Sequence, residues 1–455
     1  VMGSKVVFDI SGNTDTTLHI IGFTITASNG GEDDGSGAVV NIHGSSFWNN
    51  TTQQTESVGS GATFKHCVFT MSDSDEDWSE AAVDIKESTV VFDNCEFTNI
   101  FVDYTNYQNG DAFSAAIRVG SPYGSGSQSG STVILRRSKI TNNKIQRTDV
   151  GYIHAGAIMV GPSRFNNVKL INTIIADNEV YYSNNVNSGY PTTAGAIKVR
   201  GGHLQLINST IVNNELKTDE NYTGGGGAMH LADWDGDGYQ PYVTMLNSII
   251  YGNVTTTSGG SNFQDQIMIE DYHDEVEAYF SYSVIQGDDD FGGDDIFHAE
   301  PSFLDSTYAL HPRSPAIGQG SAEGEDVFGN IINAPQIDYA GNVRPNPAGS
   351  NPDIGAWENS LAVSPYPDSP TGLFATEDNQ SVLLFWSAPD ARDVVQYRIY
   401  YSDDSTSFTL IDSTTGQYST EGSVTGLTND ERYWFYVTSV DTAGYESSPS
   451  IQVVA

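Results

Sequence analysis

Cysteine, basic residues and long apolar runs are all scarce in this chain. Only two cysteines occur among 455 residues, which excludes a disulfide framework. No run of about 18 apolar residues is present, so the sequence predicts no transmembrane segment. Lysine and arginine total 19 against 58 acidic residues, and the formal net charge is -39. So acidic a surface repels nucleic acid, and we therefore expect other partners than DNA or RNA.

Glycine, asparagine, serine and threonine are abundant, and the apolar runs are short. The 46 glycines and the many turn-forming residues favour an all-β chain over a helical one. A chain of this length predicts several domains or a repeat array. The sequence opens inside an apparent strand, at residues 5–10, from which we expect a processed or truncated N-terminus.

A short alternating apolar strand followed by a small residue recurs along the first 290 residues. Aligning the repeats gives one shared corner position, occupied in turn by Phe23, Ser45, Cys67, Cys95, Ser138, Thr173, Ser209, Ser248 and Ser283. The shortest steps, of 22 residues, are interpreted as one turn of a parallel β-helix, and the longer steps as turns with inserted loops. A β-sandwich would not place the same residue types at one corner nine times.

Two further patterns follow this repeat. A Gly-Ala strand recurs at residues 37, 81, 115, 156, 195 and 227, with Ala in place of Gly in two of its copies. An asparagine recurs downstream of the first strand, where left-handed backbone and hydrogen bonds to the next turn predict an Asn ladder at a corner. Its members are Asn50, Asn143, Asn178, Asn214 and Asn253. Together the patterns predict a parallel β-helix of about nine or more turns.

Cys67 and Cys95 occupy the same predicted corner on neighbouring turns. Adjacent strands would place their Cα atoms about 4.8 Å apart, which permits a disulfide. Parallel Cβ directions suit a disulfide poorly, so a bridge and two stacked thiols both remain open.

Three motifs near residue 340 resemble a known family. SPAIGQG (residues 314–320), DYAGNVRP (338–345) and PDIGAWE (352–358) appear in the order found in secreted bacterial right-handed β-helix proteins of the choice-of-anchor Q type. Gly318 replaces that family's usual Asp, and Trp357 its usual Tyr. The resemblance implies a right-handed β-helix over residues 1–300, a region capping its open end over 301–362, and export with retention at the bacterial surface.

Residues 363–455 resemble a fibronectin type III domain. A proline-rich linker precedes them, and Trp386 and Tyr397 lie in successive predicted strands. Leu427, six residues before Tyr433, matches the tyrosine corner of that family. The resemblance implies a β-sandwich that serves as an extracellular spacer or contact module.

The segment DWDGDGY at residues 233–239 resembles the first half of a calcium-binding loop. Asp233, Asp235 and Asp237 alternate before a glycine, and the carbonyl of Tyr239 would follow as a ligand. The twelfth position is Thr244 where an EF-hand has Glu, so another loop would complete the site. We expect bound Ca²⁺, against the alternative of a solvated acidic loop.

Ten of the 19 basic residues fall between residues 118 and 200. On the Gly-Ala strands the outward position is occupied in turn by Asp84, Arg118, Met159, Lys198 and His230, and Arg200 lies on the same face as Lys198. Such a ridge would suit a lyase that neutralises a uronate carboxylate and removes its C5 proton. The alternative is an ordinary polar face on which nearby acids pair with the cations.

Tyrosines are frequent in the inserted loops, which we expect to gather along one side of the β-helix. Their rings beside Asn, Ser and Asp favour sugar stacking or contact with a neighbouring protein, although they could equally pack the loops down. They are Tyr104, Tyr107, Tyr123, Tyr152, Tyr181, Tyr182, Tyr190 and Tyr222.

No nucleophile elbow, phosphate loop or zinc-type Cys/His set accompanies these patterns. The leading hypothesis is therefore a cell-surface structural or adhesive protein that binds extracellular glycan or further copies of itself, with assembly into fibres as one form. The alternative is a polysaccharide lyase using Lys198, Arg200, Arg118 and His230. Whether the chain is an enzyme stays open at this point.

Overall fold

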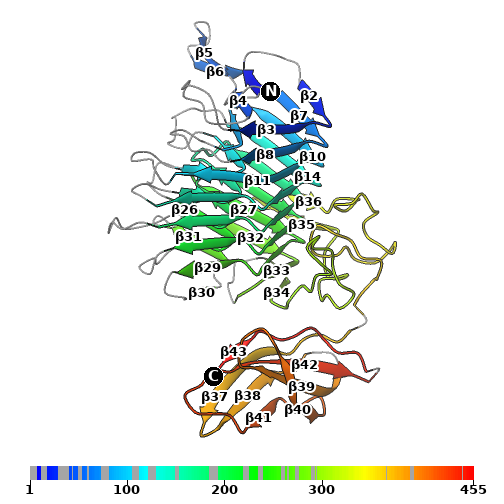
Figure 1. Cartoon of the computed structure of the whole chain (residues 1–455). Helices are drawn as coiled ribbons and strands as arrows, with labels where there is room; N and C mark the ends of the chain where they lie inside the picture. The colour runs from blue at the N-terminus through cyan, green and yellow to red at the C-terminus, as the bar shows by residue number, and fades with distance from the viewer. Residues whose placement is uncertain are drawn as a thin grey trace. The chain divides into compact units, whose positions relative to one another are not determined.

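The computed structural model describes residues 8–11, 18–28, 40–43, 45–49, 54–58, 61–72, 81–104, 112–120, 130–148, 153–183, 193–218, 225–233, 239–257, 262–263, 266–271, 276–287, 293, 295–364, 366–389, 394–442 and 444–455. Every regular element within these ranges is a β-strand (Figure 1). A search of the same ranges finds no helix of the length and hydropathy that a membrane crossing requires. The chain forms two compact units.

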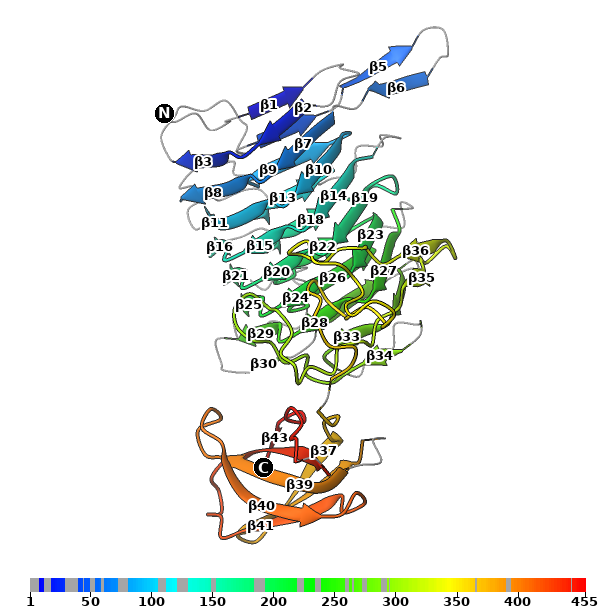
Figure 2. The same ribbon diagram turned by 90° about the vertical axis from the view of Figure 1, so that its right-hand side faces the viewer.

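Two parallel sheets of the first unit have eight strands each within the described residues. Sheet A contains β1 (Phe8–Ser11), β4 (Val40–His43), β9 (Val83–Lys86), β13 (Ile117–Val119), β18 (Ile158–Val160), β22 (Ile197–Val199), β26 (Met229–Asp233) and β31 (Ile267–Asp271). Sheet B contains β2 (Leu18–Ile21), β7 (Gly61–Lys65), β10 (Thr89–Asp93), β14 (Thr132–Arg136), β19 (Asn167–Ile171), β23 (Gly202–Ile207), β27 (Pro241–Leu246) and β32 (Glu277–Ser281). Both stacks run along the solenoid axis (Figure 2).

Sheet C is formed from two stacks that the long strand β11 (Glu96–Asp103) joins. The first contains β3 (Thr24–Ser28), β8 (Val68–Ser72), β15 (Lys139–Thr141), β20 (Ile174–Ala176), β24 (Thr210–Val212), β28 (Ile249–Tyr251), β33 (Ser283–Ile285) and β34 (Ile296–Phe297). The second contains β16 (Lys144–Arg147), β21 (Glu179–Tyr182), β25 (Glu215–Thr218), β29 (Val254–Thr257) and β30 (Asn262–Phe263). A short parallel pair, β12 (Ala112–Ser114) and β17 (Ile153–Ala155), completes this unit's parallel pairing. The predicted parallel β-helix is confirmed.

Alternate residues of each strand point into a continuous apolar core. In sheet B the inward row holds Phe64, Phe92, Leu135 and Leu170, all buried and paired in register. Phe64 and Phe92 stack with their ring centroids 5.2 Å apart. Because side chains alternate with period two, the same strands leave a second set of residues on the outer face.

Corners between the sheets are formed by residues with left-handed backbone. From Cys67 to Ser283, the residue before each Cys, Ser or Thr of the repeat has a positive φ, as at Asn94, Asn172 and Asn208. The residue before each of the ladder asparagines from Asn143 to Asn253 does so too, as at Asn142 and Asn213. The left-handed conformation that we predicted for the ladder asparagines therefore belongs to their predecessors, since short polar side chains tolerate it best.

The Asn ladder itself is confirmed in the described turns. The Nδ2 of Asn143 donates to the Oδ1 of Asn178 at 2.9 Å, and Asn178 donates in the same way to Asn214 at 2.8 Å. Asn214 continues to Asn253, which donates to the Oε1 of Gln266. All these side chains are buried, so each amide satisfies buried polar groups of its neighbours. Asn50 lies outside the described residues.

One part of the predicted register is wrong. Strand β2 pairs directly with β7, and β3 pairs with β8, so the segments around Phe23 and Cys67 are neighbours and no turn separates them. Ser45 instead begins an antiparallel hairpin of β5 (Ser45–Asn49) and β6 (Gln54–Val58). The preceding Val40–His43 belongs to sheet A. Both sheets need the same period-two pattern, so that pattern alone could not assign this strand.

Cys67 and Cys95 are free thiols. The Sγ of Cys67 donates to the carbonyl of Lys65 at 3.3 Å, and that of Cys95 to the carbonyl of Phe64 at 3.3 Å. Burial raises the pKa of Cys95 to about 12. Of the two possibilities that the sequence left open, the structure has the stacked thiols.

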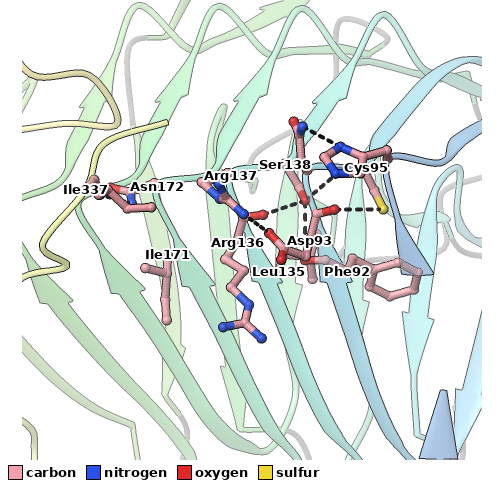
Figure 3. A network of polar contacts seen from close by, with 12 residues as sticks. Phe92, Asp93, Cys95, Leu135, Arg136, Arg137, Ser138, Ile171, Asn172 and Ile337 are labelled. Carbon is pink, nitrogen blue, oxygen red and sulfur yellow. Dashed lines mark hydrogen bonds and ion pairs between the residues drawn. The ribbon is translucent and has the colours of Figure 1, made fainter. Parts of the chain in front are cut away.

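Residues 321–344 and 355–357 also belong to the first unit. They include the hairpin of β35 (Glu323–Glu325) and β36 (Ile331–Asn333). Asn172 donates to the carbonyl of Ile337 at 2.7 Å, and Asn247 donates to that of Ser321 at 2.7 Å. We expected this region to cap an open end, but these contacts lie on corners of interior turns and place it along the side of the solenoid (Figures 1 and 3).

The second unit consists of residues 297–320, 345–354 and 358–455. One sheet contains β37 (Thr371–Asp378), β38 (Ser381–Ser387) and β41 (Glu421–Thr425), and the other β40 (Thr409–Thr415), β39 (Val394–Ser402), β42 (Trp434–Asp441) and β43 (Val453–Val454). Trp386 and Tyr397 are buried between them, with centroids 5.4 Å apart. The hydroxyl of Tyr433 accepts from the amide of Thr428 at 3.2 Å, which confirms the tyrosine corner.

Candidate functional site

The outward row of sheet A has the predicted order but is not open to solvent. Register places Asp84 beside Arg118, Arg118 beside Met159, and Met159 beside Lys198. His230 follows Lys198 on β26. The exposed fractions are 0% for Arg118, 1% for Lys198 and 1% for His230. We expected an exposed cationic ridge, and the structure instead has a buried polar row.

Asp84 is the electrostatic centre of this row. The Nε of Arg118 donates to its Oδ1 at 2.8 Å, and the Nη2 of Arg118 to its Oδ2 at 2.7 Å. The Nε2 of His43 and the Nζ of Lys86 each lie 3.0 Å from the Oδ2. Burial alone would raise the pKa of Asp84, but the charge of Arg118, its hydrogen bonds with His43 and Arg118, and the charge of Lys86 hold it well below its usual value.

The remaining candidates of the row are also enclosed or separated. Met159 lies between Arg118 and Lys198, so the two cations are not neighbours. The Nε2 of His230 lies 3.2 Å from the Oε2 of Glu270 on the next strand. Arg200 is half-buried and its backbone amide donates to the carbonyl of Val160. A polymer cannot reach Arg118, Lys198 and His230 in this arrangement without displacing what covers them.

Other cations of the same segment are paired on sheet C. Lys144 and Lys217 lie 2.8 Å and 2.6 Å from the carboxylate of Glu179, and Lys217 also contacts Glu215 at 3.0 Å. Burial opposes ionisation of Glu179, yet the hydrogen bonds from both lysines lower its pKa, and the same partners raise the pKa of Lys217 against its own desolvation. This network supports the alternative that nearby acids neutralise the basic segment.

Part of the outer face of sheet B, over β23 and β27, is covered by another segment of the chain. The hairpin β35–β36 lies over β23 and β27, where Val327 donates its amide to Thr244 and the Phe328 ring contacts His203 and Tyr242. Gln205, Thr244 and Leu246 are buried beneath it. Burial and the charge of Lys169 lower the pKa of His203 to about 4, against the opposing charge of Asp326.

The other half of sheet B is open. Across β7, β10, β14 and β19 the outward side chains are half-buried or exposed. Their charged members are Lys65, Asp93, Arg136 and Lys169. Asp93 accepts from Arg137 at 2.6 Å, and Arg136 extends away from that pair (Figure 3). Arg136 and Lys169 are two of the ten basic residues between 118 and 200, and their outward positions on the first repeat strand are the sequence signal that separates them from the cations of sheet A.

Three of the predicted loop tyrosines, Tyr104, Tyr181 and Tyr182, lie in the part of the chain that the structure describes. Tyr104 and Tyr182 are buried, with 4% and 6% exposed, and both pack in the main hydrophobic core. For these two the prediction of sugar stacking is wrong, because the rings fill space beside β11 and β21. Tyr181 is half-buried on β21. Tyr107, Tyr123, Tyr152, Tyr190 and Tyr222 lie outside the described residues.

The predicted calcium loop is only partly described. Asp233 ends β26 and pairs in register with Asp271 at the end of β31. Tyr239 is half-buried, while Asp235 and Asp237 lie outside the described residues. Among the residues that the structure does describe, no three His, Cys, Asp or Glu side chains are grouped to hold a metal.

Comparisons with known proteins identify one domain. The family model "Fibronectin type III domain" matches residues 368–455. Similar solved structures include an Fn3-like protein from Clostridium thermocellum, 28% identical, covering 19% of this chain and 90% of that one at a TM-score of 0.17. The fn3 domain of human collagen alpha-1(XX) chain is 19% identical, covering 20% and 86% at a TM-score of 0.17. No curated protein matches the chain. The chain therefore contains a C-terminal fibronectin type III domain.

Proposed function

We propose that this protein is a structural or adhesive component of a bacterial cell surface or its extracellular matrix. The parallel β-helix is the scaffold, and the fibronectin type III domain is a spacer or contact module. The observation that carries the proposal is that the outer row of sheet A is buried and its Arg118 is paired with Asp84, so the exposed cationic ridge on which the lyase hypothesis depends is not formed. Its partners in this proposal are an extracellular glycan or further copies of the chain.

The internal ladders suit a mechanical role. Each turn of a solenoid contacts only its neighbours, so stiffness depends on the bonds between adjacent turns. Here the Asn ladder and a second ladder of Ser and Thr hydroxyls both link successive turns, as where Ser248 accepts from the amide of Ser209 at 3.0 Å. These side chains are committed to structure, since all are buried.

The alternative function, a polysaccharide lyase, has less support from the structure. Arg118 is held in a bidentate pair with Asp84, and a guanidinium that already neutralises a carboxylate is not available for a uronate. Lys198 is buried, so it cannot contact a C5 proton of a bound polymer in this conformation.

Calcium binding by residues 233–239 is part of the proposal. Asp233, Asp235, Asp237 and the carbonyl of Tyr239 would supply oxygen ligands, and Asp271 is the register partner of Asp233 on the neighbouring strand. Calorimetric titration with Ca²⁺ tests this directly. The Asp235→Asn/Asp237→Asn variant should lose the binding heat, and a variant that retains it would contradict this assignment.

The experiment for the function as a whole uses the full chain with calcium and a panel of acidic and neutral polysaccharides. Size-exclusion chromatography then follows both the glycan and the protein. We expect glycan of unchanged length, with the protein eluting either bound to it or as a larger assembly. Shortened glycan with the ultraviolet absorbance of an unsaturated uronate would overturn the non-catalytic proposal.

A further inference from the structure

The open half of sheet B differs in charge from the rest of the molecule. The chain has 19 basic residues against 58 acidic ones. The outer face of β7, β10, β14 and β19, however, has three basic side chains and one acidic side chain. The basic ones are Lys65, Arg136 and Lys169, and the acidic one is Asp93. Arg137 at the adjoining corner forms an ion pair with the carboxylate of Asp93, with its Nη2 2.6 Å from the Oδ1. The face therefore carries an excess of positive charge.

These cations differ in their pairing from the ones on sheets A and C. The outward row of sheet A has Arg118 paired with Asp84, and sheet C has Lys144 and Lys217 paired with Glu179. No ion pair joins Lys65, Arg136 or Lys169 to an acid in the part of the chain that the structure describes. Figure 3 shows the guanidinium of Arg136 directed away from the Asp93–Arg137 pair. Their charge is thus available to a ligand.

The face is also regular. Its strands are parallel and in register, so equivalent outward positions recur about every 4.8 Å along the solenoid axis. Lys65 and Arg136 occupy one row two strands apart, hence about 10 Å from each other, and Asp93, which Arg137 neutralises, lies between them. Thr63 lies two residues before Lys65 in the row that ends at Lys169, and Thr89 and Thr132 hold the third outward row. Three parallel rows thus carry cations and hydroxyls at spaced positions, and spaced cations are complementary to a linear polymer that carries anionic groups along its length.

The chain already covers the continuation of this face. On β23 and β27 the hairpin β35–β36 buries Gln205, Ile207, Thr244 and Leu246, which hold the same outward rows. The open half ends where the hairpin begins, so a ligand has a defined strip across β7 to β19. In the covered half, the outward rows of β23 and β27 pack against the hairpin β35–β36, so the same rows can contact an extended chain.

We propose that the outer face of β7, β10, β14 and β19 binds a linear anionic polysaccharide, with Lys65, Arg136 and Lys169 contacting its carboxylate or sulfate groups. This site rests on the proposed adhesive function and names the ligand class for it. The net charge of -39 repels such a polymer at long range, but the repulsion is screened beyond about 8 Å at physiological ionic strength. Contacts at the face lie inside that distance and keep most of their attraction.

The test uses the full chain and two immobilised probes, polygalacturonate for carboxylates and dextran sulfate for sulfates, with uncharged dextran as the neutral control. The on-face variant is Lys65→Gln/Arg136→Gln/Lys169→Gln. The off-face variant, Lys144→Gln/Arg313→Gln/Arg432→Gln, removes the same charge from other surfaces. Thermal unfolding and circular dichroism establish that both variants fold. At 0.15 M salt we expect wild-type binding to at least one anionic probe, a tenfold or greater loss on the face, and less than a twofold loss off it.

Equal losses in the two variants, or no wild-type binding to either anionic probe, would overturn the site. Self-association that only the on-face variant abolishes, without binding to the probes, would assign the face to a second copy instead. Chain shortening of polygalacturonate in the same incubation would refute the non-catalytic function and leave the binding site standing, so the two failures can be told apart.

Discussion

Asp84 determines whether Arg118, in the outward row of sheet A, is available to a ligand, because its carboxylate pairs with that guanidinium. From the sequence, Arg118 and Lys198 could be placed on one outward row by the period-two alternation, and that placement was correct. Their burial could not be predicted, because it depends on what covers the face and not on the strand's own pattern. The bidentate bonds to Asp84 likewise depend on side-chain geometry that strand spacing leaves open.

Replacing Asp84 by Asn should destabilise the β-helix by about 3 to 5 kcal/mol, because it leaves the buried guanidinium of Arg118 without its counter-charge. Urea-induced unfolding measures the change. In the double variant Asp84→Asn/Arg118→Met we expect much of the loss to be recovered, since both charges are then absent. A double variant as unstable as Asp84→Asn alone would show that the pair is not the cause.

His203 predicts a pH dependence. Its pKa falls from 6.5 to about 4 in the folded protein, chiefly by burial. Between these values the unfolded chain binds the proton and the folded chain does not, so the stability contributed by neutral His203 is complete above pH 6.5 and is lost as the pH falls towards 4. We expect roughly 2 kcal/mol of loss from this group between pH 7 and pH 4.5. The control is His203→Gln, and an equal loss in it would exclude His203.

At the scale of elements, the ladders could be predicted best. Asparagines spaced by one turn predicted stacked amides, and Asn143, Asn178 and Asn214 form them. The assignment of residues 40–43 failed, because Val40 and Ile42 alternate in the way that either sheet requires. The preceding Gly-Ala at residues 37–38 was the better signal, since it marks the strands of sheet A in later turns.

Asn178→Ala tests the ladder as an element. Asn178 donates to Ile140 and Asn214 and accepts from the amides of Asn143, so its loss leaves several buried groups without partners. We expect about 3 kcal/mol of destabilisation. Each unsatisfied buried group costs about 1 to 3 kcal/mol, and small movements of the neighbouring side chains recover part of that cost. Amide hydrogen exchange should accelerate first in the turns that contain Asn143 and Asn214. Uniform exchange along the solenoid would contradict a local ladder.

At the scale of the whole chain, the two domain types could be predicted, because each carries a repeating or spaced pattern of its own. The path of residues 321–344 could not, since its contacts join residues far apart in sequence. Arg344 donates to the Oδ1 of Asn172 and the carbonyl of Gly355, and no local pattern near Arg344 indicates either acceptor. The motif DYAGNVRP predicted a capping role for the segment that contains Arg344, whereas the structure has Arg344 on the corner of an interior turn.

Arg344→Ala should therefore release the segment along the side of the β-helix while the turns beneath it stay folded. Arg344 is only 4% exposed, and its removal takes a donor from the Oδ1 of Asn172 and leaves the carbonyl of Gly355 only the 3.5 Å bond from Asn208, at a cost of about 1 to 3 kcal/mol. Hydrogen exchange should rise in residues 321–344 and stay unchanged in β23 and β27, whose amides remain paired with the neighbouring turns. Exposed Arg313 supplies the control, because Arg313→Ala removes the same charge without touching this contact. If exchange rose equally in both variants, net charge rather than the Arg344 anchor would hold the segment, and the boundary of the open face on sheet B would depend on salt.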